Sequence, residues 1–340
     1  MDNMSVLDRR QTLGLIGGAA ALPLLGTPAY AKTKINVGAL RFTSHAPSFV
    51  ALERGYFADA GLDVEFKFFQ AAQPMAVAIA SGDADYAVTA ISGGLISLAE
   101  KGATKVIGGA LSEEKGIDGQ KILASNQAYE AGLTSPAMLD GRTFAVTQTG
   151  SSFHYMGSKI SAKEGVSLRY KPLQKVGAII GAIKSGQVDA WTIVPHIATA
   201  LANGGAVKVI GNVADYIPNY QITTVFTSAR NAASERAKTE AFLAAFSKGA
   251  ADFNAALVDK TAGADASEEM VKLIHKYVYA DRPYENALGS IIAGAMRIKQ
   301  GAALNVASVQ YQLDWFNAEK FIKYTETMHT HVDPSYVKSF

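Results

Sequence analysis

Short apolar runs typical of buried strands alternate with helical stretches over most of this 340-residue chain, and this alternation constrains the fold more than any other feature. Between the runs, apolar positions recur at the spacing of an amphipathic helix. Repeated strand–helix units predict parallel sheets with right-handed crossovers. We expect strands at residues 35–40, 63–68, 86–89, 106–110, 121–123, 143–147, 168–170, 188–193, 207–210 and 221–227.

The units form two sets, followed by a nearly all-helical tail. We expect a first lobe over residues 32–120 and a second lobe over 121–221, with a return to the first lobe and the tail over 222–340. No stretch has the composition of a flexible linker, so strands should cross between the lobes. In α/β sheets ligands bind beyond the carboxyl ends of strands, which points to the loops at those ends.

Composition excludes several classes of protein. Lys and Arg number 32 against 30 for Asp and Glu, a balance that argues against a nucleic-acid partner. The chain has no cysteine, which excludes a disulfide framework, a thiolate metal site and a cysteine nucleophile.

The N-terminal residues 1–31 are typical of a secretory signal. Arg9 and Arg10 precede an apolar run over residues 13–26, and small residues follow it, so we expect cleavage after Ala31 and a periplasmic mature protein. The apolar run is too short to span a bilayer. The arginine pair resembles a twin-arginine signal, although ordinary secretion stays open.

Four blocks in order resemble the nitrate/sulfonate/taurine-type solute-binding proteins of ABC importers. They are ALERGYFADAGLDV at 51–64, ASGDAD at 80–85, LDGRTFAV at 139–146 and IKSGQVDA at 183–190. The resemblance implies an α/β, two-lobed periplasmic-binding-protein fold (type II-like) with a ligand cleft between the lobes. It also implies a monomeric binding protein rather than an enzyme, with no cofactor or metal, that delivers a small-molecule ligand to an ABC permease and its ATPase at the inner membrane.

Several polar residues follow the expected strands and are candidate ligand contacts. Hydroxyls and an imidazole after the first strand can hold an anionic group or a ring nitrogen, and Ser residues beside free helix N–H groups can hold an anion. The candidates are Arg41, Thr43, Ser44, His45, Gln70, Ile91, Ser92, Thr149, Gly150, Ser151, Ser152, Trp191 and Pro195.

Several of these candidates also have a purely structural alternative. Ser44, and a serine of the 151–152 pair, could simply cap helices, Arg41 could form a surface ion pair and Trp191 could fill the core. The other tryptophan, Trp315, lies in the tail, which we expect to be distant from the cleft.

Enzyme interpretations have less support, because the chain contains no G-x-S-x-G, H-E-x-x-H or P-loop motif. His329, His331 and Asp333 have a spacing that could ligate a metal, but their C-terminal segment is a poor scaffold for one.

We expect the protein to capture an organosulfonate or an aromatic carboxylate. The resemblance implies a thiamine-precursor pyrimidine as the alternative ligand, because His45 falls where pyrimidine-binding relatives of the family carry His. Nitrate ranks last, and a secreted enzyme of the same fold is the alternative class.

Overall fold

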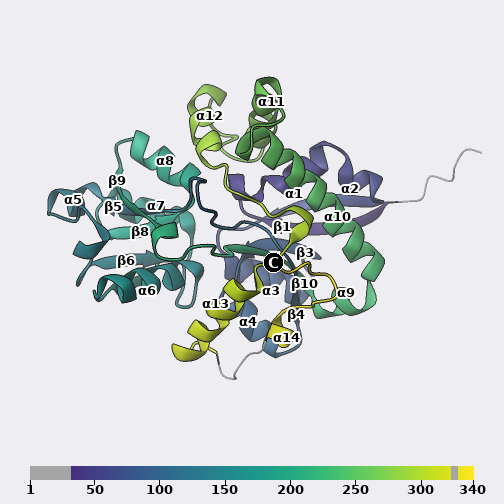
Figure 1. The fold of residues 1–340 in the computed structure, drawn as a ribbon, viewed down its shortest axis with the longest axis horizontal. Coiled ribbons are helices and arrows are strands. Elements are labelled where there is room, and N and C mark those ends of the chain that lie inside the picture. The colour runs from purple at the N-terminus through teal and green to yellow at the C-terminus, as the bar shows by residue number, and fades with distance from the viewer. Residues whose placement is uncertain (1–31, 323–327) are drawn as a thin grey trace, which may run out of the picture. The chain divides into compact units, whose positions relative to one another are not determined.

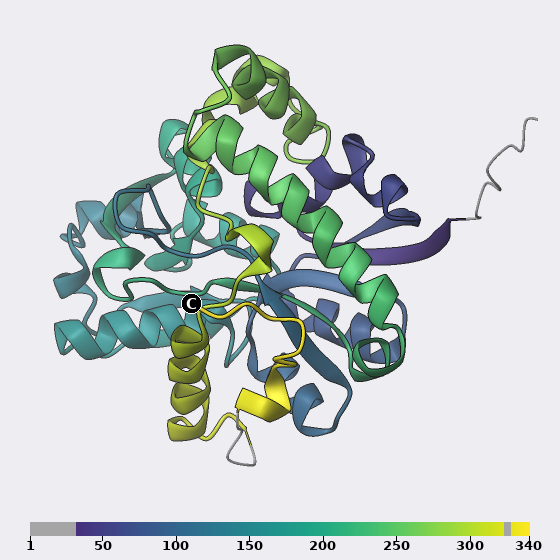
Figure 2. The same ribbon diagram turned by 45° about the vertical axis from the view of Figure 1, so that its right-hand side comes forward.

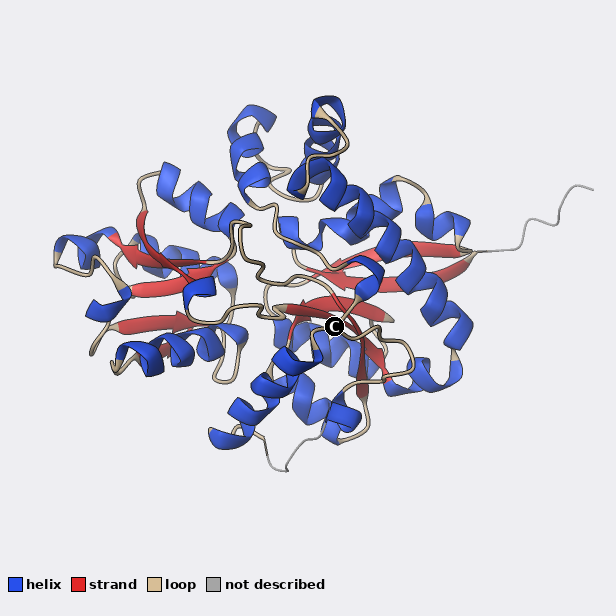
Figure 3. Ribbon diagram, viewed as in Figure 1, coloured by secondary structure: helices blue, strands red, loops and turns tan. Residues whose placement is uncertain are grey.

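Ten strands form two five-stranded sheets in a computed structural model that describes residues 32–322 and 328–340 (Figures 1 and 3). Each strand overlaps one predicted from the sequence, which confirms the α/β class. The predicted signal over residues 1–31 lies outside the described residues. Within the described part of the chain, no helix is long and apolar enough to cross a membrane.

The first sheet has the strand order β2-β1-β3-β10-β4. β1 pairs in parallel with both β2 and β3, whereas β10 runs antiparallel between β3 and β4. The strands are β1 (Thr33–Ala39), β2 (Leu62–Phe68), β3 (Tyr86–Ala90), β4 (Thr104–Gly109) and β10 (Thr223–Ser228).

The second sheet has the order β7-β6-β8-β5-β9. β6 is parallel to β7 and β8, and β5 runs antiparallel between β8 and β9. The strands are β5 (Lys121–Ser125), β6 (Thr143–Val146), β7 (Arg169–Pro172), β8 (Ala190–Ile193) and β9 (Val207–Asn212).

The prediction of purely parallel sheets is wrong, because each sheet contains one antiparallel strand. The chain passes from β4 to β5 through residues 110–120, and from β9 back to β10 through residues 213–222. We call these the first and second crossing segments. A strand that arrives from the other sheet enters without the helical crossover that a parallel neighbour requires, so it can run in the opposite direction.

Helices cover the sheets and make up most of the C-terminal part, with α10 packed along α1 (Figure 2). The tail is less helical than expected, because Gly294 closes α12 and an extended segment follows. The helices are α1 (Ala46–Glu53), α2 (Tyr56–Asp59), α3 (Ala72–Ser81), α4 (Gly93–Glu100), α5 (Asn126–Glu130), α6 (Ser152–Glu164), α7 (Val176–Lys184), α8 (Pro195–Asn203), α9 (Ala229–Ser234), α10 (Arg236–Phe253), α11 (Ala264–His275), α12 (Tyr284–Ala293), α13 (Val306–Ala318) and α14 (Met328–His331).

In both sheets, an Asp carboxylate just before the central strand accepts a hydrogen bond from a backbone N–H of the neighbouring strand. Before β3, Gly82 ends a helix at φ 85°, and the Asp85 carboxylate accepts a hydrogen bond from the Asn36 N–H of β1 at 2.8 Å. Before β8, Gly186 has φ 71°, and Asp189 accepts from the Thr143 N–H of β6 at 2.7 Å. The S-G-x-x-D blocks at 81–85 and 185–189 are therefore equivalent positions, and none of their residues lines either of the two cavities described below.

We predict that Asp85→Ala and Asp189→Ala each lower the free energy of unfolding by about 1.5–3 kcal/mol, because each change removes a charge-assisted bond and leaves a backbone N–H of the neighbouring strand without its partner. Asp83→Ala is the matched control, since the one partner of its carboxylate among the described residues is the exposed Ser81 hydroxyl, which donates to it. It should change stability by less than about 0.5 kcal/mol. Urea unfolding at pH 7 measures all three variants, and equal losses for Asp83 and Asp189 would contradict the assignment.

Candidate functional site

Two cavities lie between the first sheet and the second. The inner cavity has a volume of about 50 Å³, and the outer cavity has a volume of about 580 Å³. Leu40, Phe42 and Val176 line both. Strands of both sheets line the inner cavity, and the loop after β1 faces helices α7 and α8 in the lining of the outer cavity. A molecule bound in either cavity would therefore touch the layers of both sheets.

His45 and Ser44 line the inner cavity just after β1. The Leu40 N–H donates to Nδ1 of His45 at 3.4 Å, so the neutral ring carries its proton on Nε2 and can donate there. Burial lowers the pKa of His45 to about 3, which keeps the ring neutral at physiological pH. No side chain caps the helix starts in this loop, so the alternative role of Ser44 as a cap does not apply.

Ser151 and Ser152 line the opposite side of the inner cavity, at the start of α6. Ser151 caps this helix, with its Oγ accepting from the His154 N–H at 3.4 Å, and it lines the cavity as well. Ser152 is the first residue of the helix, and its hydroxyl has no hydrogen-bond partner among the described residues. A helix N-terminus carries partial positive charge, so this wall favours an anionic group.

The lining of the inner cavity contains no Asp, Glu, Lys or Arg among the described residues. A charged group bound there would therefore be held by neutral donors and by the helix end rather than by a counter-charge. The polar lining residues are Ser44, His45, Thr89, Gln120, Thr147, Ser151, Ser152 and Thr223.

Gln120 is a lining residue that the sequence analysis missed. Its side chain is 2% exposed, and its Nε2 has no hydrogen-bond partner in the described part of the chain. The neighbouring Glu113 accepts the Gln120 backbone N–H at 3.0 Å, and burial raises the pKa of this carboxyl to about 7. The only sequence signal for Gln120 is its place immediately before β5, in a crossing segment rather than after a strand.

Direct contacts across the cleft explain why four candidates do not line either cavity. The Gly93 N–H at the start of α4 donates to the Gly150 carbonyl at 2.9 Å. This bond occupies the N-terminus of α4, beside Ile91 and Ser92, and also occupies the carbonyl of Gly150. The fourth of these candidates, Thr149, is exposed to solvent. A second cross-cleft bond joins the Val176 N–H to the Gln70 carbonyl at 3.2 Å. The structure is thus a closed arrangement.

Three further candidates pack against protein in this arrangement. Trp191 is fully buried in β8, where its ring meets Phe153 edge-on at 5.5 Å, so it lies behind the cavity wall. Thr43 is fully buried beside Gly294. Pro195 begins α8, and its neighbours Val194 and His196 line the inner and outer cavities instead.

The expectation that Trp315 lies away from the cleft is wrong. Trp315 on α13 donates from Nε1 to the Ser158 hydroxyl of α6 at 2.9 Å, and its ring contacts His154 and Tyr155. The next residue, Phe316, lies close to both Gly93 and Gly150. The helical tail therefore packs against the second sheet's layer at the cross-cleft contact. No local pattern could indicate this long-range contact.

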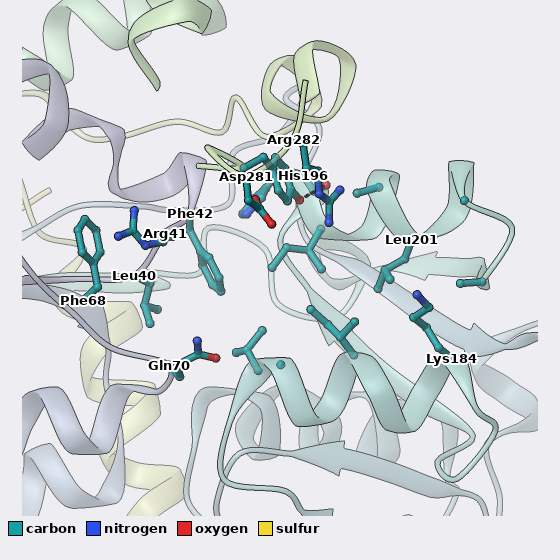
Figure 4. Close-up of a pocket in the computed structure, with 18 of the residues that line it drawn as sticks. Leu40, Arg41, Phe42, Phe68, Gln70, Lys184, His196, Leu201, Asp281 and Arg282 are labelled. Carbon is teal, nitrogen blue, oxygen red and sulfur yellow. Dashed lines mark hydrogen bonds between the residues drawn. The ribbon is translucent and has the colours of Figure 1, made fainter. Parts of the chain in front are cut away.

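The outer cavity contains the remaining two candidates, Arg41 and Gln70, together with His196 (Figure 4). His196 is 1% exposed, and its Nδ1 has no partner among the described residues. Burial lowers its pKa to about 3. Phe42 separates the two imidazoles, with its ring 5.1 Å from His196 and 6.1 Å from His45.

Residues 42–256 match the family model described as NMT1/THI5 like. The alkanesulfonate-binding protein SsuA from Xanthomonas axonopodis pv. citri, bound to MOPS, has a similar structure. It shows a TM-score of 0.69 and 16% identity over 92% of this chain and 100% of that chain. No curated protein matches the chain significantly.

Two further structures have the same fold. The periplasmic nitrate-binding protein NrtA from Synechocystis PCC 6803 gives a TM-score of 0.70 at 14% identity, covering 90% of this chain and 87% of that chain. The periplasmic aliphatic sulphonate binding protein SsuA from Escherichia coli gives 0.68 at 17% identity, covering 89% and 98%. At these identities the likeness shows the fold alone.

The buried, neutral state of His45 predicts a specific pH dependence of stability. The unfolded chain protonates this imidazole near pH 6.5, whereas the folded ring stays neutral down to about pH 3. The neutral, buried ring of His45 therefore contributes its full stabilisation above pH 6.5. This contribution is lost as the pH falls from 6.5 towards about 3. Between pH 7 and pH 5, His45→Gln should lose less free energy of unfolding than the wild type, by an amount on the order of 2 kcal/mol.

His329→Gln is the matched control, because His329 is exposed to solvent. This variant should follow the wild-type pH profile. Chemical denaturation at the two pH values measures the difference, and a His45→Gln profile that parallels the wild type would show that the folded ring protonates normally.

Proposed function

Because this chain belongs to the NMT1/THI5-like family, we propose that it is the extracytoplasmic solute-binding component of an ABC importer, which captures a small organic anion between its two lobes. In this proposal the lobes are residues 32–120 with 222–340, and residues 121–221. The mature monomer, cleaved after Ala31, would deliver the solute in the periplasm to a permease and its ATPase. Closure of two lobes on a ligand is the switching mode of periplasmic binding proteins.

The observation that carries the proposal is the wall formed by Ser152, Ser151 and the start of α6, opposite His45 across an uncharged cavity. Hydroxyl and imidazole donors suit sulfonate or carboxylate oxygens, and the positive helix end offsets the charge. The inner cavity has room for a head group of a few atoms rather than a whole aromatic ligand. A thiamine-precursor pyrimidine is the second candidate, because Nε2 of His45 can donate to a ring nitrogen.

We expect calorimetric titration of the mature protein to show binding of methanesulfonate or benzenesulfonate. Ser152→Asp should then weaken this binding by several kcal/mol, because it places a fixed carboxylate where the ligand's charge lies. Ser152→Ala is the matched control and should cost only about 1–2 kcal/mol, because the backbone N–H groups remain.

Equal small losses for both Ser152 variants would contradict an anion at this wall. Binding of a 4-aminopyrimidine but of no sulfonate or benzoate would favour the second candidate. Mass spectrometry of the recovered ligand separates a binding protein from an enzyme of the same fold, because a binding protein returns the ligand unchanged.

A further inference from the structure

The outer cavity has the size and lining of a ligand subsite rather than of a solvent channel. Its volume of about 580 Å³ falls in the range of small-molecule pockets. Its floor is apolar and comes from the loop after β1 and from helices α7 and α8, with Leu40, Phe42, Val176, Ile180, Ile197 and Leu201. The first three of these residues also line the inner cavity, so the two cavities are adjacent. An apolar floor beside the inner cavity is suited to the apolar body of a molecule whose head group lies in the inner cavity.

Three cations and one anion line the same cavity at exposed positions: Arg41, Lys184, Arg282 and Asp281. Among the ion pairs of residues 32–322 and 328–340, none includes any of the three cations. The whole chain carries 32 basic and 30 acidic side chains, so this local excess is not a general feature of its surface. The cavity edge thus offers unpaired positive charge beside an apolar floor.

Aromatic rings hold the two guanidinium groups in place. The Arg41 guanidinium lies 3.8 Å from the centre of the Phe68 ring and donates to the Tyr277 carbonyl at 3.1 Å. The Arg282 guanidinium lies 4.4 Å from the Tyr279 ring. Stacking fixes the plane of a guanidinium while its N–H edge stays available for a carboxylate.

His196 provides an independent sign that a polar ligand atom is received here. Its Nδ1 is buried without a partner among the described residues, and the ring lines the outer cavity beside Phe42. A buried polar atom without a partner costs free energy, so such atoms are normally satisfied by protein, water or ligand.

We propose that the outer cavity is a second subsite of the cleft, and that the solute is an elongated organic dianion with an acidic group at each end of an apolar body. One acidic group lies at the Ser152 wall of the inner cavity, and the other meets Lys184 and Arg282. The proposal rests on the proposed function and narrows its class of solute. Single-headed anions would occupy only part of the cleft.

Three probes separate the contributions of head group, body and second charge: methanesulfonate, benzenesulfonate and 4-sulfobenzoate, with 3-sulfobenzoate as a second geometry. By calorimetry on the mature protein at low salt, benzenesulfonate should bind more tightly than methanesulfonate. One of the sulfobenzoates should bind at least about tenfold more tightly than benzenesulfonate, as expected for a charge pair of about 1.4 kcal/mol. This preference should shrink at high ionic strength.

The double variant Lys184→Gln/Arg282→Gln should lose the tenfold preference and keep its affinity for benzenesulfonate within about twofold. The matched control is Arg169→Gln/Lys208→Gln, which removes the same two charges from exposed positions of the second sheet that line neither cavity. It should behave like the wild type for every probe.

Failure of this inference differs from failure of the proposed function. If benzenesulfonate binds but neither sulfobenzoate is preferred, or if the preference survives in the Lys184/Arg282 variant, the dianion subsite is overturned and the proposed function stands. If neither benzoate nor any of the four sulfonates binds, the dianion subsite and the anionic solute of the proposed function are both overturned.

Discussion

The pairing of the two crossing segments is the constraint on which the rest of the structure depends. The chain passes between the sheets twice, and the two passages bond to each other: the Ile222 N–H donates to the Leu111 carbonyl and the Glu113 N–H to the Tyr220 carbonyl, both at 2.9 Å. We call the two hydrogen-bonded crossing segments the paired ribbon. Helix α13 contacts this ribbon through Ser308, whose hydroxyl accepts the Gln221 N–H at 2.8 Å. Any movement of one sheet relative to the other must be absorbed in this paired ribbon.

The same ribbon contributes to the inner cavity. Leu111, Gln120, Ile222 and Thr223 belong to the crossing segments or to the start of β10, and all four line it. Apart from these residues, a few direct backbone hydrogen bonds join the layers of the two sheets across the cleft. Examples are the bonds from the Gly93 N–H to the Gly150 carbonyl and from the Val176 N–H to the Gln70 carbonyl. A ligand that contacts both the His45 loop and the start of α6 would add bonds only in the closed arrangement. Such a differential contact is what shifts a conformational equilibrium.

The sequence predicted local structure well because strand and helix periods are local signals. All ten strands were placed, and the loops after β1 and β6 supplied Ser44, His45, Ser151 and Ser152 at the inner cavity. The direction of β5 and β10 could not be predicted, because side-chain alternation is the same for a strand in either direction.

Two features of the tryptophans also have no local sequence signal. Trp191 lies near a strand end, as expected, but its ring lies behind Phe153. The orientation of a side chain in a strand that is buried on both faces cannot be predicted from the sequence pattern. Contacts made by the tail, such as Trp315 with Ser158, depend on long-range packing.

The central claim, that a solute stabilises the closed arrangement of the two lobes, is tested most directly by a distance across the hinge. The chain has no cysteine, so a thiol-reactive spin label would attach only at cysteines introduced for this purpose. Asp59→Cys on α2 and Glu130→Cys on α5 place the two labels at exposed positions in the layers of different sheets (Figure 1). Pulsed electron paramagnetic resonance should give a broad or shifted distance distribution without ligand and a single narrow one, matching this structure, with a saturating bound sulfonate. An identical distribution with and without a ligand that calorimetry shows to be bound would contradict the claim.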